Sequence, residues 1–319
     1  MRGAYQLIHK LTVNTAIDKL LFIDAFNRDN TNRIRRKEEV LGGKGTHVSI
    51  NLSILGEDSG CFGITQGETG TRILDILNAR GNLDVRMLHY NDGESRTNYA
   101  LIENDHTCSL ITEKGKLVSK QRCEELLDTM QEHVKPGDYL VLSGDANNTE
   151  IPFFYNAIMQ RLANKGVRFI LDTSSQNLAE ALKEKPYLVK PNVDELSQIM
   201  GYPIETEAQI LEGLRFIANQ GVEIVAVSCG GDGSYVLYQD VVYRVYPLKV
   251  NVINTIGCGD AYLTGLVYGL NKELPFLQTL QVATAISAAT AESDLTVGFD
   301  LERAMSLRDQ VKVEVMSNI

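Results

Sequence analysis

The sequence lacks the features that mark several classes of protein. No run approaches 18 apolar residues, which excludes a membrane-spanning helix of ordinary length. Residues 1–10 carry polar and charged side chains and lack the apolar core of a signal peptide. The cysteines include no Cys-x-x-Cys pair, which excludes a recognisable zinc site and fits free thiols in a reducing compartment. We therefore expect a cytoplasmic protein with five unpaired cysteines: Cys61, Cys108, Cys123, Cys229 and Cys258.

An excess of basic over acidic residues is also missing, as are the usual sequence motifs of nucleotide-binding proteins. The formal net charge of −10 argues against nucleic acid and against anionic membranes as partners. A Gly-x-Gly-x-x-Gly motif is absent, which disfavours a dinucleotide-binding protein. Gly42-Gly43-Lys44 is not a Walker A loop, because Glu38 stands where that motif needs its first glycine. The 44% hydrophobic content nevertheless supports a substantial folded core.

After about residue 119, short apolar segments alternate with amphipathic helical patterns. This alternation predicts an α/β fold, in which a mainly parallel sheet is covered by helices on both faces. The expected strands are 138–142, 167–172, 187–190 and 223–228, and the expected helices are 151–165, 176–184, 193–200 and 206–219. The small residues of 258–291 predict two packed helices.

Two excursions break this rhythm, at about 11–40 and 95–115, and neither has a helical pattern. The second resembles a hairpin with strands 98–102 and 107–111. We expect both to form a small β-sheet lid beside the main body, within a single domain that spans 1–319. A further hairpin, 234–237 with 241–245, is expected at the edge of the main sheet.

The most informative segment is Asn254–Gly265, in which a Gly-Cys-Gly turn precedes an apolar helix. We expect a strand at 250–253 before the turn. Unpaired amides at a helix start bind anions such as phosphate. Asp260 in the first turn then fits the general base of a phosphoryl transfer. The alternative is that Asp260 only stabilises the helix macrodipole.

Two motifs near the start of the chain could bind a substrate. Lys44 lies between glycines before a helix expected at 48–55, where it could hold a phosphate or a sugar hydroxyl, or belong to a flexible turn. Asp18 is expected at the end of the first strand, where ligands often bind, although a turn or cap explains it equally.

Arg33 and Arg96 carry guanidinium groups suited to phosphate, but some arginines here belong to a solvated face.

Two later motifs allow a structural and a functional reading. Asn192 is a natural helix N-cap and Glu195 stands at the capping-box position. The functional alternative is that both orient waters of a nucleotide-bound Mg²⁺. The glycine-rich turn 228–233 is either a hairpin connector or a wall for the nucleotide.

Taken in this order, these motifs resemble the PfkB (ribokinase-like) family of sugar kinases over essentially the whole chain. They look most like its phosphosugar branch, which includes tagatose-6-phosphate and fructose-1-phosphate kinases. The segments that carry this resemblance are 14–18, 32–33, 42–45, 96–98, 143–144, 172–174, 190–192 and 254–260. The resemblance implies a three-layer α/β/α body with a β-sheet lid, and phosphorylation of a sugar hydroxyl by ATP with Mg²⁺.

The resemblance also implies a role for each matching residue. Asp260 would be the general base, and the amides of Gly257, Cys258 and Gly259 would form the anion hole. The substrate would be bound by Asp18, Arg33, Lys44, His47, Arg96, Asn98 and Ser143. ATP would lie against Lys190, Asn192, Ser228, Gly230, Gly233, Gly257 and Gly259. Asn192 and Glu195 would place Mg²⁺ through water.

Four residues depart from the family pattern. His47 stands where asparagine is usual, and it can titrate near neutral pH. Thr15 replaces a proline, and Asp145 falls where a proline-rich turn is usual. Cys258 replaces an alanine; a thiol at a helix start is expected to have a lowered pKa and to react readily, unless it only fills a small site. These departures leave the identity of the sugar open.

The sequence therefore predicts an ATP-dependent kinase for a phosphorylated ketohexose. A kinase for an unphosphorylated sugar or a nucleoside is disfavoured, since Lys44, Arg33 and Arg96 would then lack an anionic partner. A non-catalytic sugar-phosphate sensor is disfavoured by the intact 257–260 segment. A lid has exposed strand edges, so we expect a homodimer joined through the lids.

Overall fold

The computed structural model describes residues 6–105 and 107–316. Residues 1–5, on which part of the expectation about a signal peptide rests, lie outside the described residues. The strands are β1 (Ile8–Thr12), β2 (Ala16–Phe22), β3 (Arg36–Gly42), β4 (Ser59–Gln66), β5 (Leu83–Tyr90), β6 (Arg96–Ile102), β7 (Cys108–Ile111), β8 (Tyr139–Ser143), β9 (Arg168–Asp172), β10 (Leu188–Val189), β11 (Ile224–Ser228), β12 (Ser234–Tyr238), β13 (Val241–Val245) and β14 (Val313–Met316). The helices are α1 (Lys44–Ile54), α2 (Gly67–Asn78), α3 (Lys120–His133), α4 (Phe154–Leu162), α5 (Ser175–Ala181), α6 (Val193–Met200), α7 (Glu207–Ala218), α8 (Cys258–Asn271), α9 (Phe276–Ala291) and α10 (Leu301–Arg308).

The large sheet has the order β14-β13-β12-β11-β10-β9-β8-β1-β4-β5 in the part of the chain that is described. From β5 to β11 neighbouring strands are parallel, which confirms the predicted α/β class. The hairpin β12–β13 joins β11 antiparallel. It was expected at the sheet edge, but β14 pairs with β13 and covers it. Strand β14 was not predicted, because its four residues are exposed or half-buried and form no apolar run.

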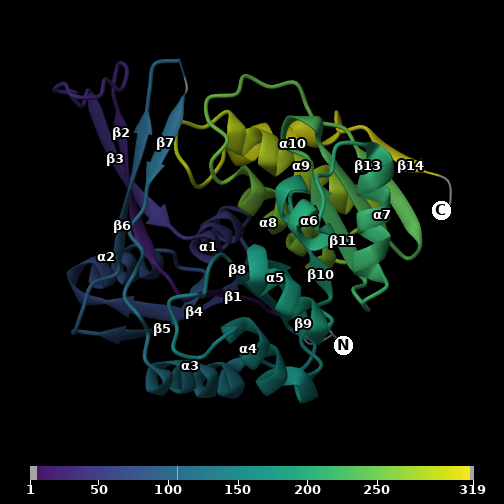
Figure 1. Ribbon diagram of the computed structural model, residues 1–319, viewed down its shortest axis with the longest axis horizontal. Coiled ribbons are helices and arrows are strands. Elements are labelled where there is room, and N and C mark those ends of the chain that lie inside the picture. The colour runs from purple at the N-terminus through teal and green to yellow at the C-terminus, as the bar shows by residue number, and fades with distance from the viewer. Residues whose placement is uncertain (1–5, 106, 317–319) are drawn as a thin grey trace.

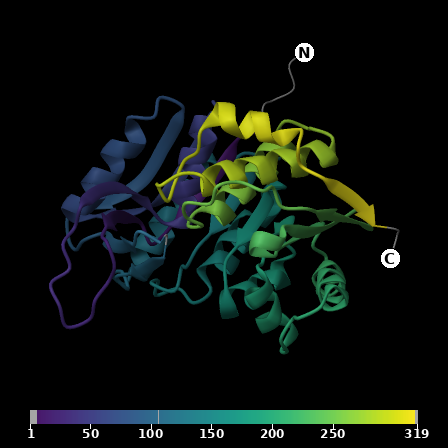
Figure 2. The ribbon, with the colours of Figure 1, turned by 90° about the horizontal axis from the view of Figure 1, so that it is seen from above.

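Alternate residues of the parallel strands face opposite helical layers. In β8, Leu140 and Leu142 join a core with α3 to α7, whereas Tyr139 and Val141 join a core with α1, α8, α9 and α10. Figure 2 shows the two helical layers on either side of the sheet. This burial of both strand faces explains the nearly continuous apolar runs in the sequence.

The small residues of α8 and α9 allow these helices to pack closely, as expected for 258–291. A Cβ at Gly265 would come within 2.4 Å of the Ala283 Cα, so no larger side chain fits without movement. This contact holds α8 firmly against α9, and it positions the start of α8 at the edge of the large sheet.

The small sheet, with the order β3-β2-β6-β7, forms beside the main body and is seen at the left of Figure 1. Strand β2 pairs antiparallel with β3 and parallel with β6. Asp18 was expected at the end of the first strand, but β1 ends at Thr12 and Asp18 lies inside β2. The chain passes from the large to the small sheet between Thr12 and Ala16, a break that the mixed apolar pattern conceals.

Three local expectations need correction. Helix α1 begins at Lys44 rather than at 48, because Gly43 adopts a positive φ of 95° and caps it directly. Residues 250–253 form no strand; the Ile253 amide donates to the Ala291 carbonyl at the end of α9 instead. Helix α4 begins at Phe154 rather than at 151 and continues through a 3₁₀ turn, Ala163–Lys165.

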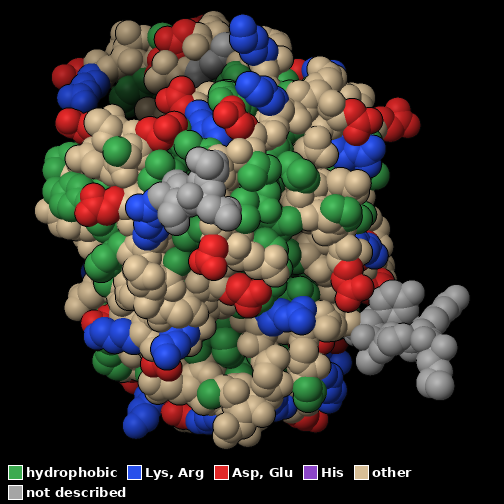
Figure 3. Space-filling model, turned by 90° about the vertical axis from the view of Figure 1, so that its right-hand side faces the viewer, with side chains coloured by type: hydrophobic (Ala, Val, Ile, Leu, Met, Phe, Trp, Pro, Cys, Tyr) green, Lys and Arg blue, Asp and Glu red, His purple; other side chains and the backbone are tan. Residues whose placement is uncertain are grey.

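The surface carries charges of both signs. On the face seen in Figure 3, acidic and basic side chains are interspersed and do not gather into a large area of one charge. Within the described residues, no helix combines the length and apolar character needed to cross a bilayer.

Candidate active site

A cleft of about 420 Å³ lies where both sheets meet, at the carboxyl ends of the parallel strands. Strand ends β1, β8, β9, β10 and β11 contribute its floor, and β2, β6 and β7 of the small sheet contribute a wall. The predicted site residues that line it are Asp18, Lys44, His47, Arg96, Ser143, Lys190, Asn192, Glu195, Ser228, Gly257, Gly259 and Asp260. Open α/β sheets bind ligands at this edge, so the cleft is the candidate active site.

The start of α8 forms one end of the cleft. Gly257 caps the helix with φ of 80°, and a Cβ there would lie 2.1 Å from the Thr296 carbonyl oxygen, so only glycine fits. The Cys258 amide donates a long bond of 3.4 Å to the Thr255 carbonyl. The Lys190 ammonium lies 3.7 Å from where a Cβ of residue 259 would be. A positive charge therefore lies beside the helix start, an arrangement suited to an anion.

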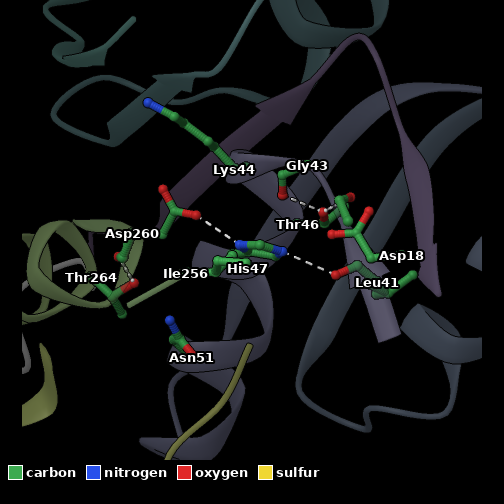
Figure 4. Close-up of polar contacts among 12 residues, drawn as sticks. Asp18, Leu41, Gly43, Lys44, Thr46, His47, Asn51, Ile256, Asp260 and Thr264 are labelled. Carbon is green, nitrogen blue, oxygen red and sulfur yellow. Dashed lines mark hydrogen bonds and ion pairs between the residues drawn. The ribbon is translucent and has the colours of Figure 1, made fainter. Parts of the chain in front are cut away.

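Asp260 lies in the first turn of α8 and its carboxylate contacts His47. The His47 Nδ1 lies 2.7 Å from Asp260 Oδ2, and His47 Nε2 lies 3.0 Å from the Leu41 carbonyl oxygen of β3. Figure 4 shows the imidazole between these two partners. Burial of the ring disfavours its charged form, but the hydrogen bond to Asp260 and the charges of Asp260 and Asp18 outweigh this and raise the pKa of His47.

A buried carboxylate, Asp172 at the end of β9, faces two lysines. Its Oδ1 lies 3.3 Å from Lys44 Nζ and 3.4 Å from Lys190 Nζ. Burial alone would raise the pKa of Asp172, but the two ammonium groups overcome this and lower it. The same contact raises the pKa of Lys44. Lys44 is therefore held as a cation in the cleft.

The small sheet positions a second polar group. Asn98 of β6 donates a 2.8 Å hydrogen bond to Asp18 Oδ1 on β2. Asp18 fits because residue 42 is glycine, where a Cβ would lie 2.0 Å from the same oxygen. Arg96 donates to the Asn14 carbonyl at 2.7 Å and to the Glu113 carbonyl at 3.3 Å, and its burial lowers the pKa of the guanidinium.

The Asn192 and Glu195 side chains form the predicted capping box. Asn192 Oδ1 accepts from the Glu195 amide at 2.7 Å, and Glu195 Oε2 accepts from the Asn192 amide at 2.9 Å. Burial of the Glu195 carboxyl raises its pKa. Both residues also line the cleft, so the structural role does not remove them from the ligand site.

Five predicted site residues lie outside the lining of the cleft: Arg33, Asn98, Cys258, Gly230 and Gly233. Arg33 is exposed in the loop between β2 and β3. Gly230 and Gly233 belong to the turn that joins β11 to β12, so this turn is a hairpin connector, and its role as a wall for the nucleotide stays a prediction. Asn98 is buried behind Asp18.

The departures from the family pattern differ in their surroundings. Thr15 Oγ1 donates to the Ile64 carbonyl at 2.9 Å, a contact directed into the body of the protein. Asp145 lines the cleft while its Oδ1 accepts from the Asn147 amide at 2.7 Å, closing its own turn.

Ser143 Oγ is buried at the cleft and finds no hydrogen-bond partner within residues 6–105 and 107–316.

The lowered pKa expected for the Cys258 thiol is wrong. Burial of the thiol and the nearby negative charge of Asp260 raise its pKa to about 11. The sequence could show that Cys258 opens a helix, but the carboxylate two residues later and the packing of α8 decide its pKa.

Sequence reasoning assigned no role to Asp172, although the segment 172–174 was noted. Its position after a buried strand was the available signal, since the carboxyl ends of parallel strands meet at one edge. Leu110 also lines the cleft and carried no recognisable signal, whereas Asn14 belongs to the segment 14–18 that was noted without a role for its first residue.

Comparison with known structures defines the class of fold. Phosphofructokinase-2 from Escherichia coli in complex with potassium superimposes with a TM-score of 0.89 at 20% identity, covering 96% of this chain and 99% of that chain. A putative phosphofructokinase from Staphylococcus aureus gives a TM-score of 0.83 at 26% identity, covering 98% and 100%. The fold is ribokinase-like, with a three-layer body and a small additional sheet.

Sequence comparison defines the family. The model of the pfkB family carbohydrate kinases matches residues 12–301. Tagatose-6-phosphate kinase of Staphylococcus epidermidis is 28% identical over 96% of this chain and 99% of its own length. 1-Phosphofructokinase of Bacillus subtilis is 28% identical over 90% of this chain and 93% of its own. The chain belongs to the pfkB family of carbohydrate kinases, and it is a phosphotransferase that acts on a hydroxyl group.

Alkylation tests the environment of Cys258. With a pKa of about 11, only about one thiol in a thousand or fewer is ionised at pH 7.5, against about a tenth for an ordinary cysteine. We expect iodoacetamide to label Cys258 in the folded protein about 100-fold more slowly than in the guanidinium-unfolded protein, as measured by mass spectrometry. Equal rates in the two states would contradict the raised pKa.

Removal of the Asp172 carboxylate tests the two-lysine contact. Asp172→Ala leaves Lys190, which is 5% exposed, without its buried partner, and we expect the free energy of unfolding to fall by about 3–5 kcal/mol. Urea denaturation measures this loss. The matched control is Asp128→Ala, which removes an exposed partner of Arg161 and should cost less than about 1 kcal/mol.

The same pair of variants gives a pH dependence. Because the folded-state pKa of Asp172 is lowered, its stabilisation is present above the unfolded pKa of about 4 and disappears as the pH falls through the folded value. The difference between the wild type and Asp172→Ala should therefore shrink below about pH 4. A difference that stays constant down to pH 2 would contradict this assignment.

Proposed function

We propose that this protein is an ATP-dependent kinase for a phosphorylated ketohexose, of the tagatose 6-phosphate or fructose 1-phosphate type. The observation that carries the proposal is Asp260, a buried carboxylate at a helix start in the cleft, with Lys44 and Lys190 facing the same space. The names of the related kinases, tagatose-6-phosphate kinase and 1-phosphofructokinase, support the substrate class.

The chemistry assigned to Asp260 is proton removal. The substrate hydroxyl gives its proton to Asp260 while its oxygen forms a bond to the γ-phosphorus of ATP and the β–γ bridging bond breaks. The amides of residues 257–259 and the Lys190 ammonium, which lies near the start of α8, would balance the negative charge on the transferred group. Loss of such a base or donor costs about 10²- to 10⁴-fold in rate.

The wall formed by the small sheet is proposed to bind the sugar. Asp18 would accept hydrogen bonds from sugar hydroxyls, with Asn98 holding its other side. Lys44 and Arg96 would bind the phosphate already on the substrate, and Ser143 offers a hydroxyl without a partner among the described residues. Arg33 could join them only by movement of its exposed loop. Asp145 then lies where it can discriminate among sugar phosphates.

ATP and Mg²⁺ are proposed at the opposite end of the cleft. Sugar kinases of this family use ATP, usually with Mg²⁺. Lys190 and Ser228 would contact the nucleotide, and the turn with Gly230 and Gly233 would lie against it. Within the described residues no group of three His, Cys, Asp or Glu side chains forms a metal cage. Oxygen donors on Asn192 and Glu195 fit a Mg²⁺ ion held through water and phosphate, which would neutralise the transferred group.

A kinase for an unphosphorylated sugar is the second candidate, and two observations favour it. Arg96 already binds two backbone carbonyls. The carboxylates that line the cleft also outnumber its lysines and arginines: Asp18, Asp145, Asp172, Glu195 and Asp260 against Lys44, Arg96 and Lys190.

A coupled ADP-release assay decides between the two candidates. We expect turnover with tagatose 6-phosphate or fructose 1-phosphate, and little with fructose, ribose or a nucleoside. Asp260→Asn should lower kcat by about 10²- to 10⁴-fold. Preference for an unphosphorylated sugar would favour the second candidate. Absence of turnover with any of them, with ATP still bound, would favour a non-catalytic sensor.

We also propose a homodimer formed through the small sheet. Ile111, on the edge strand β7, is 57% exposed, and the neighbouring Leu110 is 55% exposed. Apolar side chains on an open strand edge are usually covered by a partner.

Light scattering with matched variants tests the dimer. Ile111→Lys should give monomers at about 50 μM protein, an order-of-magnitude choice for a weak interface, whereas the wild type is dimeric. Val315→Lys, which is equally exposed at 55% but lies on β14, is the control and should stay dimeric. A monomeric wild type at that concentration would contradict the proposal.

A further inference from the structure

His47 has a hydrogen-bonding arrangement that constrains where its protons lie. The Leu41 carbonyl oxygen, 3.0 Å from Nε2, can only accept, so Nε2 carries a hydrogen. The remaining ring nitrogen, Nδ1, lies 2.7 Å from Asp260 Oδ2. Two lone pairs would repel each other at this distance. One proton must therefore lie between the ring and the carboxyl group.

The surroundings favour imidazolium and carboxylate over the neutral pair. Asp260 from α8 and Asp18 from β2 both contribute negative charge near the ring, and both charges favour the protonated imidazole. Strand β3 also contacts the ring, through the carbonyl dipole of Leu41. The side chains of His47 and Asp260 are 6% and 8% exposed, so water does not screen the pair strongly.

We propose that His47 is a positioning residue for phosphoryl transfer, which holds Asp260 through a shared proton and makes the reaction depend on a protonated histidine. This inference rests on the proposed function of Asp260. The shared proton occupies Oδ2, so Oδ1 is left to accept the proton of the substrate hydroxyl while the hydroxyl oxygen bonds to phosphorus and ADP leaves.

The sign of the pH dependence follows from this arrangement. Because the pKa of His47 is raised, the positioned form is present below that pKa and is lost as the pH rises through it. Above it, the neutral ring has one proton for two acceptors, the Leu41 carbonyl and Asp260, so it can no longer hold the carboxylate while β3 holds the ring. An asparagine at position 47 would also donate an N–H to Asp260, but it cannot lose that proton in this range.

Kinetics of His47→Asn test this dependence. For the wild type, kcat/KM should fall about tenfold per pH unit on the alkaline side, whereas His47→Asn should show no such fall. His47→Leu, which has no donor, should lose about 10²-fold in kcat at every pH because the base is misplaced. An alkaline fall that persists unchanged in His47→Asn would overturn the proposal.

His9→Asn is the matched control. It removes another buried histidine–aspartate contact, His9 Nε2 to Asp138 Oδ2 at 2.9 Å, from a position outside the cleft. This variant can lose stability but should keep the alkaline fall of the wild type. Loss of the fall in both variants would show that His47 acts only through general stability, and would contradict the proposal.

A second readout does not need activity. In ¹⁵N-histidine NMR, with His47 assigned by His47→Asn, most His47 rings should carry both protons at pH 6.5, the ordinary pKa of histidine, because the pKa of His47 is raised. Asp260→Asn should lower that pKa. A ring that is mostly neutral at pH 6.5 would overturn the shared proton. If the wild type phosphorylates no sugar, the proposed function fails and the positioning role fails with it, while the NMR titration still decides where the proton lies.

Discussion

The cleft depends on one buried carboxylate. Asp172 Oδ1 accepts from Lys44 at the start of α1 and from Lys190 after β10, so a single oxygen fixes two ammonium groups from distant parts of the chain. Two cations at this spacing would repel each other without it, and the 1% exposed carboxylate would be costly without them. Because each charge needs the other, the contact fixes the proposed sugar end of the cleft relative to the proposed nucleotide end.

The small sheet is coupled to helix α8 by hydrogen bonds and not only by its position beside the cleft. Leu41 of β3 contacts His47, and His47 contacts Asp260 at the start of α8. Asp18 on β2 lies close enough to affect the ionisation of the same ring. A ligand that displaces the small sheet would therefore act on the carboxylate that is proposed to remove the proton.

The sequence predicts features set by local geometry, and it fails where distant packing decides. The glycine turn before Asp260 and the capping box of Asn192 and Glu195 were predictable because they need only neighbouring residues. Strand β14 and the two-lysine contact of Asp172 join segments far apart in the chain. Cys258 shows the same limit, because the burial that raises the pKa of its thiol is set by tertiary packing.

Asp260 is proposed to act in the chemical step and not in binding. Single-turnover transfer of the γ-phosphate, measured by rapid quench with enzyme in excess, separates the two for Asp260→Ala. Calorimetry on the same sample measures the affinity for ATP and for the sugar phosphate. Both affinities should stay within about tenfold of the wild type while transfer slows by about 10²- to 10⁴-fold. Transfer at the wild-type rate, or slow transfer explained entirely by lost binding, would contradict this role of Asp260.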